Sequence, residues 1–212
     1  MTATSRLAAF AVTSDISDDA RAVARAALQD TVGVMLAGAV EPAAKITQRV
    51  ARADGGPGPC HILGTSDRTG PSYAALTNGT AAHALDFDDM CWTTLAHPSA
   101  PLVAAGLAVG EIVDVSGLAF LDAYVVGFEI EAVLGNTMNP SHYESGWHCT
   151  STIGTIGATA TAARILGLDT EQTARALAIA ASEASGIKEN FGTMVKPLQG
   201  GLAARNGVLA AL

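Results

Sequence analysis

Residues 98–134 read PSAPLVAAGLAVGEIVDVSGLAFLDAYVVGFEIEAVL and indicate two consecutive helices. Pro98 favours a helix start, because a proline in the first turn gives up no backbone hydrogen bond. This first helix is expected to run to Val113. Ser116 is a typical N-cap residue, and the helix after it is expected to end near Leu134, before Gly135. The apolar side chains here are mostly small, which permits close packing of one helix on another.

The chain on both sides of this stretch shows further helix starts and stops. The helices it predicts cover residues 18–38, 43–53, 71–85, 150–166, 170–185 and 197–212, with Ser17 and Asp169 as N-caps. Residues 60–63 form the one convincing strand. There is no strand–helix–strand alternation and no GxGxxG after a strand. The sequence therefore predicts an all-α, multi-helix domain with at most one short strand or hairpin.

The composition suggests that part of this chain's surface is buried against another subunit or domain. Of the 212 residues, 49% are hydrophobic and only 15% are charged, against about 25% charged in an average globular protein. We expect residues 1–212 to form a single helical domain, with a partner subunit or a further domain on its apolar surface. A homodimer is expected. The last predicted helix reaches Leu212 without a C-cap, so we expect the natural protein to continue and this chain to be truncated.

Charge and cysteine content exclude several classes of protein. The net charge is −8, and no run of Lys or Arg occurs, so nucleic acid is not an expected partner. Cys60, Cys91 and Cys149 are odd in number and far apart, which argues against a disulfide scaffold and a zinc ribbon. The N-terminus lacks the apolar core of a signal peptide, and no uninterrupted apolar run has membrane-spanning length. We expect a cytoplasmic protein with no membrane partner.

Three loops between the predicted helices carry titratable side chains. They lie at residues 83–99, 142–148 and 188–197. His97, His148 and Lys196 each lie at or beside a predicted helix start, where unpaired backbone N–H groups are available. Cations that converge with helix N-termini suit a polycarboxylate substrate.

Two metal-dependent alternatives use the same residues. The first loop supplies ligand types for Mg²⁺, Mn²⁺ or Zn²⁺, although in no familiar spacing; these residues are His83, Asp86, Asp88, Asp89 and His97. The run DFDD at 86–89 also superficially resembles the aspartate cluster of the all-helical isoprenoid synthases. Here the run is flanked by Gly, Pro and His, and no second acidic motif occurs.

Four blocks, in this order, resemble the MmgE/PrpD family, which includes 2-methylcitrate dehydratase and cis-aconitate decarboxylase. They are LQDTVG at 28–33 with LAG at 36–38, NGTAAHALDFDD at 78–89 with HPS at 97–99, GWH at 146–148 with Gly154 and Gly157, and KPLQG at 196–200 with Gly207. The resemblance implies a large helical domain and a smaller α/β lid domain. This chain would be the N-terminal part of the helical domain, without the lid.

The resemblance also implies site residues. The family's active-site positions fall on Asp86, His97, His148 and Lys196. The residues expected to bind substrate or support the site are His83, Asp88, Asp89, Thr93, Thr94 and Ser99. The decarboxylases carry a threonine directly after DFDD. Met90 stands there in this chain, and the loop to His97 is about one residue longer, so Thr93 and Thr94 are the candidates to replace that threonine.

The resemblance, together with these residues, implies a lyase that needs no cofactor and no metal and acts on a small di- or tricarboxylic acid. His97 and His148 are expected to be its acid and base, Asp86 to orient an imidazole, and Lys196 to anchor a carboxylate. A hydro-lyase similar to 2-methylcitrate dehydratase is the first expectation. The alternatives are a decarboxylase of the cis-aconitate type, an epimerase of the iminodisuccinate type, a metal-dependent helical enzyme, and an inactive fragment or subunit.

Overall fold

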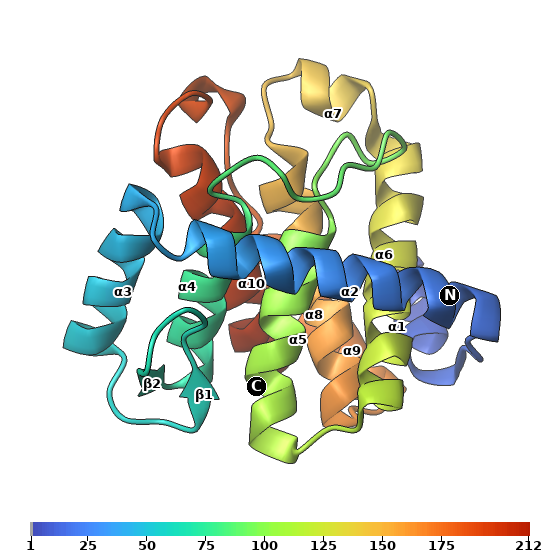
Figure 1. The fold of residues 1–212 in the computed structure, drawn as a ribbon. Helices are drawn as coiled ribbons and strands as arrows, with labels where there is room; N and C mark the ends of the chain where they lie inside the picture. Colours follow the sequence, from blue (N-terminus) through green and yellow to red (C-terminus); the bar gives the residue numbers. More distant parts are fainter. Residues whose placement is uncertain (1) are drawn as a thin grey trace.

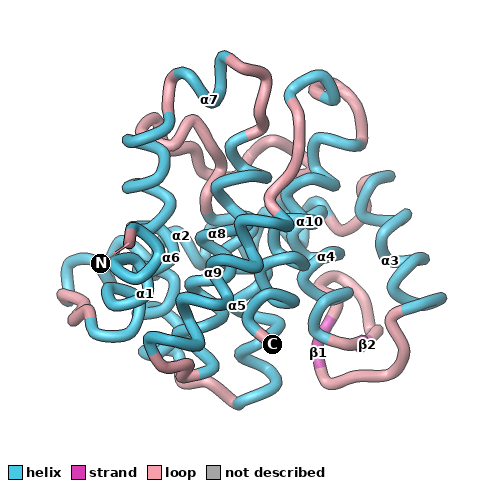
Figure 2. The backbone as a smooth tube through the Cα atoms, turned by 180° about the vertical axis from the view of Figure 1, so that it is seen from behind, coloured by secondary structure: helices cyan, strands magenta, loops and turns pink. Residues whose placement is uncertain are grey.

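The computed structural model describes residues 2–212, and this part of the chain is almost entirely helical (Figures 1 and 2). The helices are α1 (Ala3–Thr13), α2 (Asp18–Gly38), α3 (Pro42–Asp54), α4 (Pro71–Ala82), α5 (Ser99–Val113), α6 (Gly117–Met138), α7 (Ser141–Glu144), α8 (Cys149–Leu166), α9 (Thr170–Glu183) and α10 (Val195–Ala211), with a 3-10 turn η1 (Lys188–Asn190). The strands β1 (Cys60–His61) and β2 (Arg68–Thr69) pair as an antiparallel hairpin. The prediction of an all-α fold is confirmed.

Helices α4, α5, α8 and α10 pack on one another at the centre of the molecule. Helix α6 lies along α8, and α1 and α9 cover the outer side of α8. Helix α2 crosses in front of α5 and α6, while α3 and the hairpin lie beside α4 (Figure 1). No single described helix has the length and apolarity to span a membrane; α2 and α3, bent by 85°, meet those criteria only when taken together.

Helices α4 and α10 approach so closely that only glycine fits between them. A Cβ atom added to Gly201 would lie 2.2 Å from the carbonyl oxygen of Leu76, and one added to Gly79 would lie 3.0 Å from the Cα atom of Gly201. Interiors at native packing density leave no room for such an atom. This contact sets the first turn of α10, with Lys196, against the end of α4, where His83 lies.

Helices α6 and α8 enclose a carboxyl group. Glu131 is fully buried, and neither of its oxygens has a hydrogen-bond partner among residues 2–212. A Cβ atom on Gly157 of α8 would lie 2.4 Å from the Cγ atom of Glu131, so this glycine leaves the space that the carboxyl group fills. Burial, with a smaller contribution from the charge of Asp89, raises the pKa of Glu131 well above its ordinary value.

Several boundaries differ from the sequence prediction. Helix α1 was not predicted; it begins with Ser5 N–H donating to the Thr2 hydroxyl and buries Ala8 and Ala11. Helix α6 continues to Met138, past Gly135, which was read as a stop. A Cβ atom at Gly135 would lie 2.6 Å from the Cα atom of Thr94. This glycine therefore serves close packing.

Three smaller differences concern the second loop, the end of α4 and the length of β1. The second titratable loop, at 142–148, overlaps the short helix α7, and residues 135–138 before it still belong to α6. Helix α4 ends at Ala82 instead of Leu85, because His83 leaves the helical backbone region as the C-cap. The predicted strand at 60–63 is shorter, since only Cys60 and His61 pair with β2.

Candidate active site

The three titratable loops come together at one end of the helix bundle (Figures 1 and 2). His83 ends α4, His97 lies two residues before α5, His148 is the N-cap of α8, and Lys196 lies in the first turn of α10. The ring centroid of His83 is 4.8 Å from that of His97 and 5.7 Å from that of His148. The structure thus brings three histidines from three different elements into one cluster.

Asp86 and Lys196 form an ion pair at the open side of this cluster. The Lys196 Nζ atom lies 2.5 Å from Asp86 Oδ1, and His97 Nε2 lies 3.6 Å from the same oxygen. Burial alone would raise the pKa of Asp86, but the hydrogen bond and charge of Lys196 outweigh it, and the pKa is lowered. Asp86 also has a φ of 57°, in the left-handed region. The carboxylate is therefore ionised at neutral pH and held by a local backbone bend.

Both candidate acid–base histidines are largely neutral at pH 7. Burial lowers the pKa of His97, although the charge of Asp88 opposes this. Burial lowers the pKa of His148 to about 4. The rings of Phe191 and His148 pack in a T-shaped arrangement, with their centroids 4.9 Å apart. A neutral imidazole can accept a proton or act as a hydrogen-bond partner.

Gln199 fixes the tautomer of His148. The Nδ1 atom of His148 lies 2.5 Å from Gln199 Oε1, and Gln199 Nε2 donates to the carbonyl oxygen of Ile187 at 3.3 Å. The amide oxygen therefore faces the imidazole ring. Since that oxygen can only accept, Nδ1 carries the proton and Nε2 keeps its lone pair. His148 is thus oriented as a base through Nε2.

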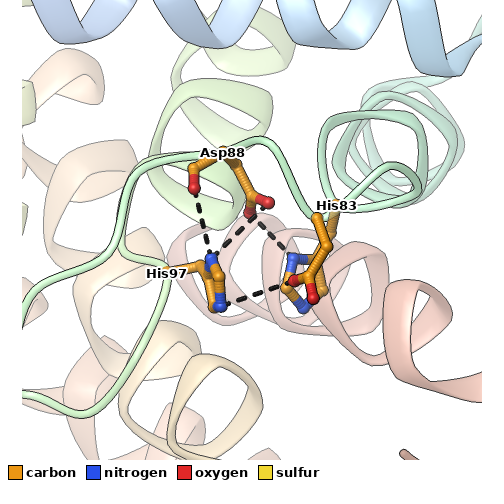
Figure 3. Close-up of side chains that lie close together, drawn as sticks. His83, Asp88 and His97 are labelled. Atoms are coloured by element: carbon orange, nitrogen blue, oxygen red, sulfur yellow. Dashed lines mark hydrogen bonds and ion pairs between the residues drawn. The ribbon is translucent and has the colours of Figure 1, made fainter. Parts of the chain in front are cut away.

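A second carboxylate lies behind the histidines. Asp88 Oδ2 is 2.8 Å from His83 Nδ1, and Asp88 Oδ1 is 3.5 Å from His97 Nδ1 (Figure 3). The side chains of Asp88 and His83 are both fully buried. From the sequence, both residues were candidate metal ligands and both were expected to support the site, but the contact of Asp88 with two histidines was not predicted.

Asp89 and Ser99 support the start of α5. The Ser99 N–H donates to Asp89 Oδ1 at 3.1 Å, and the Ser99 hydroxyl lies 2.5 Å from Asp89 Oδ2 and 2.6 Å from the hydroxyl of Tyr124. Burial raises the pKa of Asp89, although its hydrogen bonds with Ser99 oppose this. The carboxyl group of Asp89 therefore accepts from the first residue of α5, and Ser99 links this loop to Tyr124 of α6.

Thr93 and Thr94 lie away from the histidine cluster. Thr93 is exposed, and Thr94 is buried with its hydroxyl donating to the carbonyl oxygen of Cys91 at 3.1 Å. The carbonyl oxygen of Thr94 accepts from Asn139 Nδ2 at 2.7 Å, which fastens the loop to the end of α6. Neither threonine lines the cavity described next, whereas Met90 does.

A cavity of about 240 Å³ opens beside the cluster. Its lining consists of His97, His148 and Lys196 together with Met90, Trp92, Leu95, Tyr143, Thr150 and Phe191. A second cavity, of about 330 Å³, lies on the other side of Lys196 and includes His83 and Asp86 in its lining. Lys196 borders both, so its ammonium group can meet an anion in either.

A larger cavity, of about 370 Å³, lies between α1, α6, α8 and α9. Its lining is mostly apolar, and His142 is the one titratable side chain in it. His142 stacks on Trp147 with the ring centroids 5.8 Å apart and hydrogen-bonds to the hydroxyl of Thr152 at 2.8 Å. This cavity lacks the charged groups that bind a carboxylate, so size does not identify the candidate site.

Several residues of the site were not found from the sequence. Gln199 holds His148, and the Thr150 hydroxyl accepts from the backbone N–H of His97 at 3.0 Å. Tyr143 and Phe191 line the smaller cavity. Gln199 lies inside the KPLQG block, which was a usable signal, whereas nothing local marks Thr150, Tyr143 or Phe191.

Four side chains could offer ligand atoms to a metal ion. One atom from each of His83, Asp86, Asp88 and His97 lies within 4.8 Å of the others. The Lys196 ammonium group already neutralises Asp86, and His83 already contacts Asp88. A divalent cation would have to displace both contacts. The arrangement is better suited to an anionic substrate that meets an ammonium group and two neutral imidazoles.

Comparison with known proteins agrees with this geometry. Residues 5–212 match the MmgE/PrpD N-terminal domain. The chain is 33% identical over 208 residues to the cis-aconitate decarboxylase-like protein oryM of Aspergillus oryzae, covering 94% of this chain and 43% of that protein. It is 38% identical over 149 residues to cis-aconitate decarboxylase of Homo sapiens, covering 68% and 31%. It is 30% identical over 207 residues to cis-aconitate decarboxylase of Aspergillus terreus, covering 94% and 42%.

The chain spans less than half the length of these curated relatives. The match to the family's N-terminal domain nevertheless extends over nearly the whole chain, and it includes all four blocks that resemble the family. This chain belongs to the MmgE/PrpD family.

Proposed function

We propose that this chain is part of a lyase that removes a carboxyl group from an unsaturated tricarboxylic acid of the cis-aconitate type. The observation that carries the proposal is the lining of the smaller cavity, where the ammonium group of Lys196 and the imidazoles of His97 and His148 face one space. The sequence put a 2-methylcitrate dehydratase first. The relatives, which are named as cis-aconitate decarboxylases, favour the carboxy-lyase alternative instead.

Loss of a carboxyl group leaves an electron pair on the substrate. The bond between carbon and the carboxylate breaks, carbon dioxide leaves, and the electron pair spreads over the unsaturated acid. Lys196 stabilises that negative charge and holds a remaining carboxylate. A proton must then be delivered to carbon. We assign this step to His97, because Asp86 and Asp88 both favour its charged form, whereas His148 accepts a hydrogen bond or a proton through Nε2.

The test is a substrate panel with the full-length protein in D₂O, followed by NMR. We expect cis-aconitate to lose carbon dioxide and to gain one deuterium at carbon. Loss of water from 2-methylcitrate without loss of carbon dioxide would instead support the dehydratase. Exchange of a carbon-bound proton of iminodisuccinate for deuterium, without loss of water or carbon dioxide, would support the epimerase, and no reaction with any acid of the panel would contradict a lyase.

A chelator tests whether the reaction needs a metal. We expect activity to survive EDTA, because Lys196 supplies the positive charge. Activity that EDTA abolishes and that Mg²⁺ restores would support the metal-dependent alternative, in which His83, Asp86, Asp88 and His97 hold the ion.

A further inference from the structure

Among residues 2–212, Asp88 is the one fully buried carboxylate that contacts two imidazoles. Its Oδ2 atom lies 2.8 Å from His83 Nδ1, and its Oδ1 atom lies 3.5 Å from His97 Nδ1. The backbone carbonyl oxygen of Asp88 lies 3.4 Å from the same His97 nitrogen. Figure 3 shows the carboxylate between the two rings, each of which turns its Nδ1 atom toward it.

A buried carboxylate is costly unless N–H donors satisfy it. Lys196 is paired with Asp86. Among residues 2–212 no Lys or Arg pairs with Asp88. His83 Nδ1 hydrogen-bonds to Oδ2, whereas His97 Nδ1 hydrogen-bonds to the backbone carbonyl oxygen and only approaches Oδ1, which has no hydrogen-bond partner in this part of the chain. An ionised carboxylate can only accept, as can the carbonyl oxygen of Asp88. Both imidazoles must therefore carry a proton on Nδ1.

We propose that Asp88 is a positioning residue shared by two histidines: it fixes His83 and His97 in the Nδ1–H tautomer and leaves the Nε2 atom of His97 free to face the substrate. Only the last clause rests on the proposed function. Asp86, which the sequence favoured for this role, is near His97 Nε2 instead. The two aspartates therefore act on opposite nitrogens of one ring.

The same arrangement explains how His97 can become charged during a reaction cycle. Protonation of Nε2 turns His97 into an imidazolium whose Nδ1–H faces Asp88 and whose Nε2–H faces Asp86. On the far side of Asp88, His83 Nδ1 lies 2.8 Å from Oδ2, and the buried Nε2 atom of His83 has no hydrogen-bond partner among residues 2–212. The titratable and charged groups around His97 are His83, Asp86, Asp88, Asp89, His148 and Lys196.

The first test needs no variant. Histidines labelled with ¹⁵N and ¹³C in the full-length protein report the tautomer of each ring through the ¹⁵N shifts, with His83→Gln and His97→Gln identifying the signals. We expect the neutral forms of His83 and His97 to carry their proton on Nδ1. An Nε2–H tautomer at either residue would overturn the assignment.

The second test is Asp88→Asn, which keeps the shape of the side chain. Its single oxygen can accept from only one ring, and its NH₂ group faces the other. We expect one of the two histidines to move its proton to Nε2, and the titration midpoint of His97 to fall by about one pH unit. Unchanged tautomers with an unchanged midpoint would overturn the assignment. If this variant does not fold, the wild-type spectrum still decides.

Asp89→Asn is the matched control. This variant removes the same charge one residue further along the chain. In the wild type, the Asp89 carboxyl group contacts Ser99. We expect both tautomers to stay as in the wild type and the His97 midpoint to move less than in Asp88→Asn; an equal shift would mean that Asp88 acts only as a distant charge. These spectra need no turnover, so a failed substrate panel leaves them interpretable. In an active protein, Asp88→Asn should lower kcat more than it changes KM and move the alkaline limb of the rate profile to lower pH, because His97 must be protonated to deliver its proton.

Discussion

The ammonium group of Lys196 lies 2.5 Å from Asp86 Oδ1 and ties the first turn of α10 to the loop after α4. The same ammonium group borders the cavity that His97 and His148 line. It therefore neutralises a carboxylate of the protein while remaining available to a carboxylate of the substrate.

Lys196→Met should weaken substrate binding. A hydrogen bond to a charged group contributes about 1.5–3 kcal/mol, so we expect KM to rise by about 10- to 100-fold. The pKa of Asp86 should rise as well, because Lys196 is what lowers it against burial. Steady-state kinetics of the full-length protein measure the first effect. Lys188→Met is the control, since Lys188 lies over the Tyr143 ring at 3.6 Å and does not line the cavity; an unchanged KM in Lys196→Met would contradict the anchor role.

His97→Ala and His148→Ala should each lower turnover by about 10²-fold or more, the usual contribution of a general acid or base. His61→Ala serves as the control, because His61 lies in the β hairpin and pairs with Glu111. Near-normal turnover in both site variants would contradict the assignment of acid–base catalysis to these two residues.

The pH behaviour of His148 offers a test that needs no substrate. Burial holds its pKa at about 4, and the hydrogen bond with Gln199 opposes that effect. NMR titration should therefore find His148 neutral at pH 6, with its midpoint near 4. Gln199→Leu removes the acceptor that favours the protonated ring, so the midpoint should fall further. A wild-type midpoint near the ordinary 6.5 would show that the ring is not buried as described.

Glu131→Gln should make the protein more stable at neutral pH. The native state holds the carboxyl proton above the ordinary pKa of 4.5, whereas the unfolded chain releases it. Stability in the wild type is therefore complete below the ordinary pKa and is lost as pH rises toward the raised value, by up to about 1.4 kcal/mol per pH unit. The glutamine variant lacks this loss. Urea unfolding between pH 4 and 8 should show that the difference in unfolding free energy between Glu131→Gln and the wild type grows as pH rises. Glu129→Gln, at an exposed position two residues away, should show no such growth.

Gly201→Ala should destabilise the protein by about 1–3 kcal/mol, as overpacking of a tight interior does. The added Cβ atom would lie 2.2 Å from the Leu76 carbonyl oxygen. Gly33→Ala in α2 is the control of opposite sign, because nothing lies within 4 Å of its Cβ position and alanine favours a helix by about 1 kcal/mol. Equal stability of the two variants would mean that α4 and α10 are less tightly packed than described.

Local signals in the sequence predicted most of the helices. Ser17, Ser116 and Asp169 cap helices where expected, because N-capping depends on residues close in sequence. Gly135 was misread because a glycine that stops a helix and one that lets a loop approach look identical in sequence. Helix α1 was missed since its burial depends on α8 and α9, which lie far along the chain.

The candidate site also shows this difference between local sequence signals and long-range contacts. The family blocks identified His97, His148 and Lys196, yet the contacts that assign their tasks are long-range. Lys196 is 110 residues from Asp86, and Gln199 is 51 residues from His148. No local pattern encodes such pairs, because they depend on how α4, α8 and α10 pack. Thr93 and Thr94 illustrate the converse: they match by residue type, but the loop turns them away from the cavity.

The backbone of Asp86 has a consequence for how this protein tolerates change. An aspartate at φ 57° is strained by about 1 kcal/mol relative to glycine. A glycine at this position would relax the loop and remove the carboxylate that Lys196 holds. Selection for folding alone would therefore favour replacement of Asp86, whereas selection for turnover would retain the aspartate. Substitutions at this position thus distinguish the two kinds of selection.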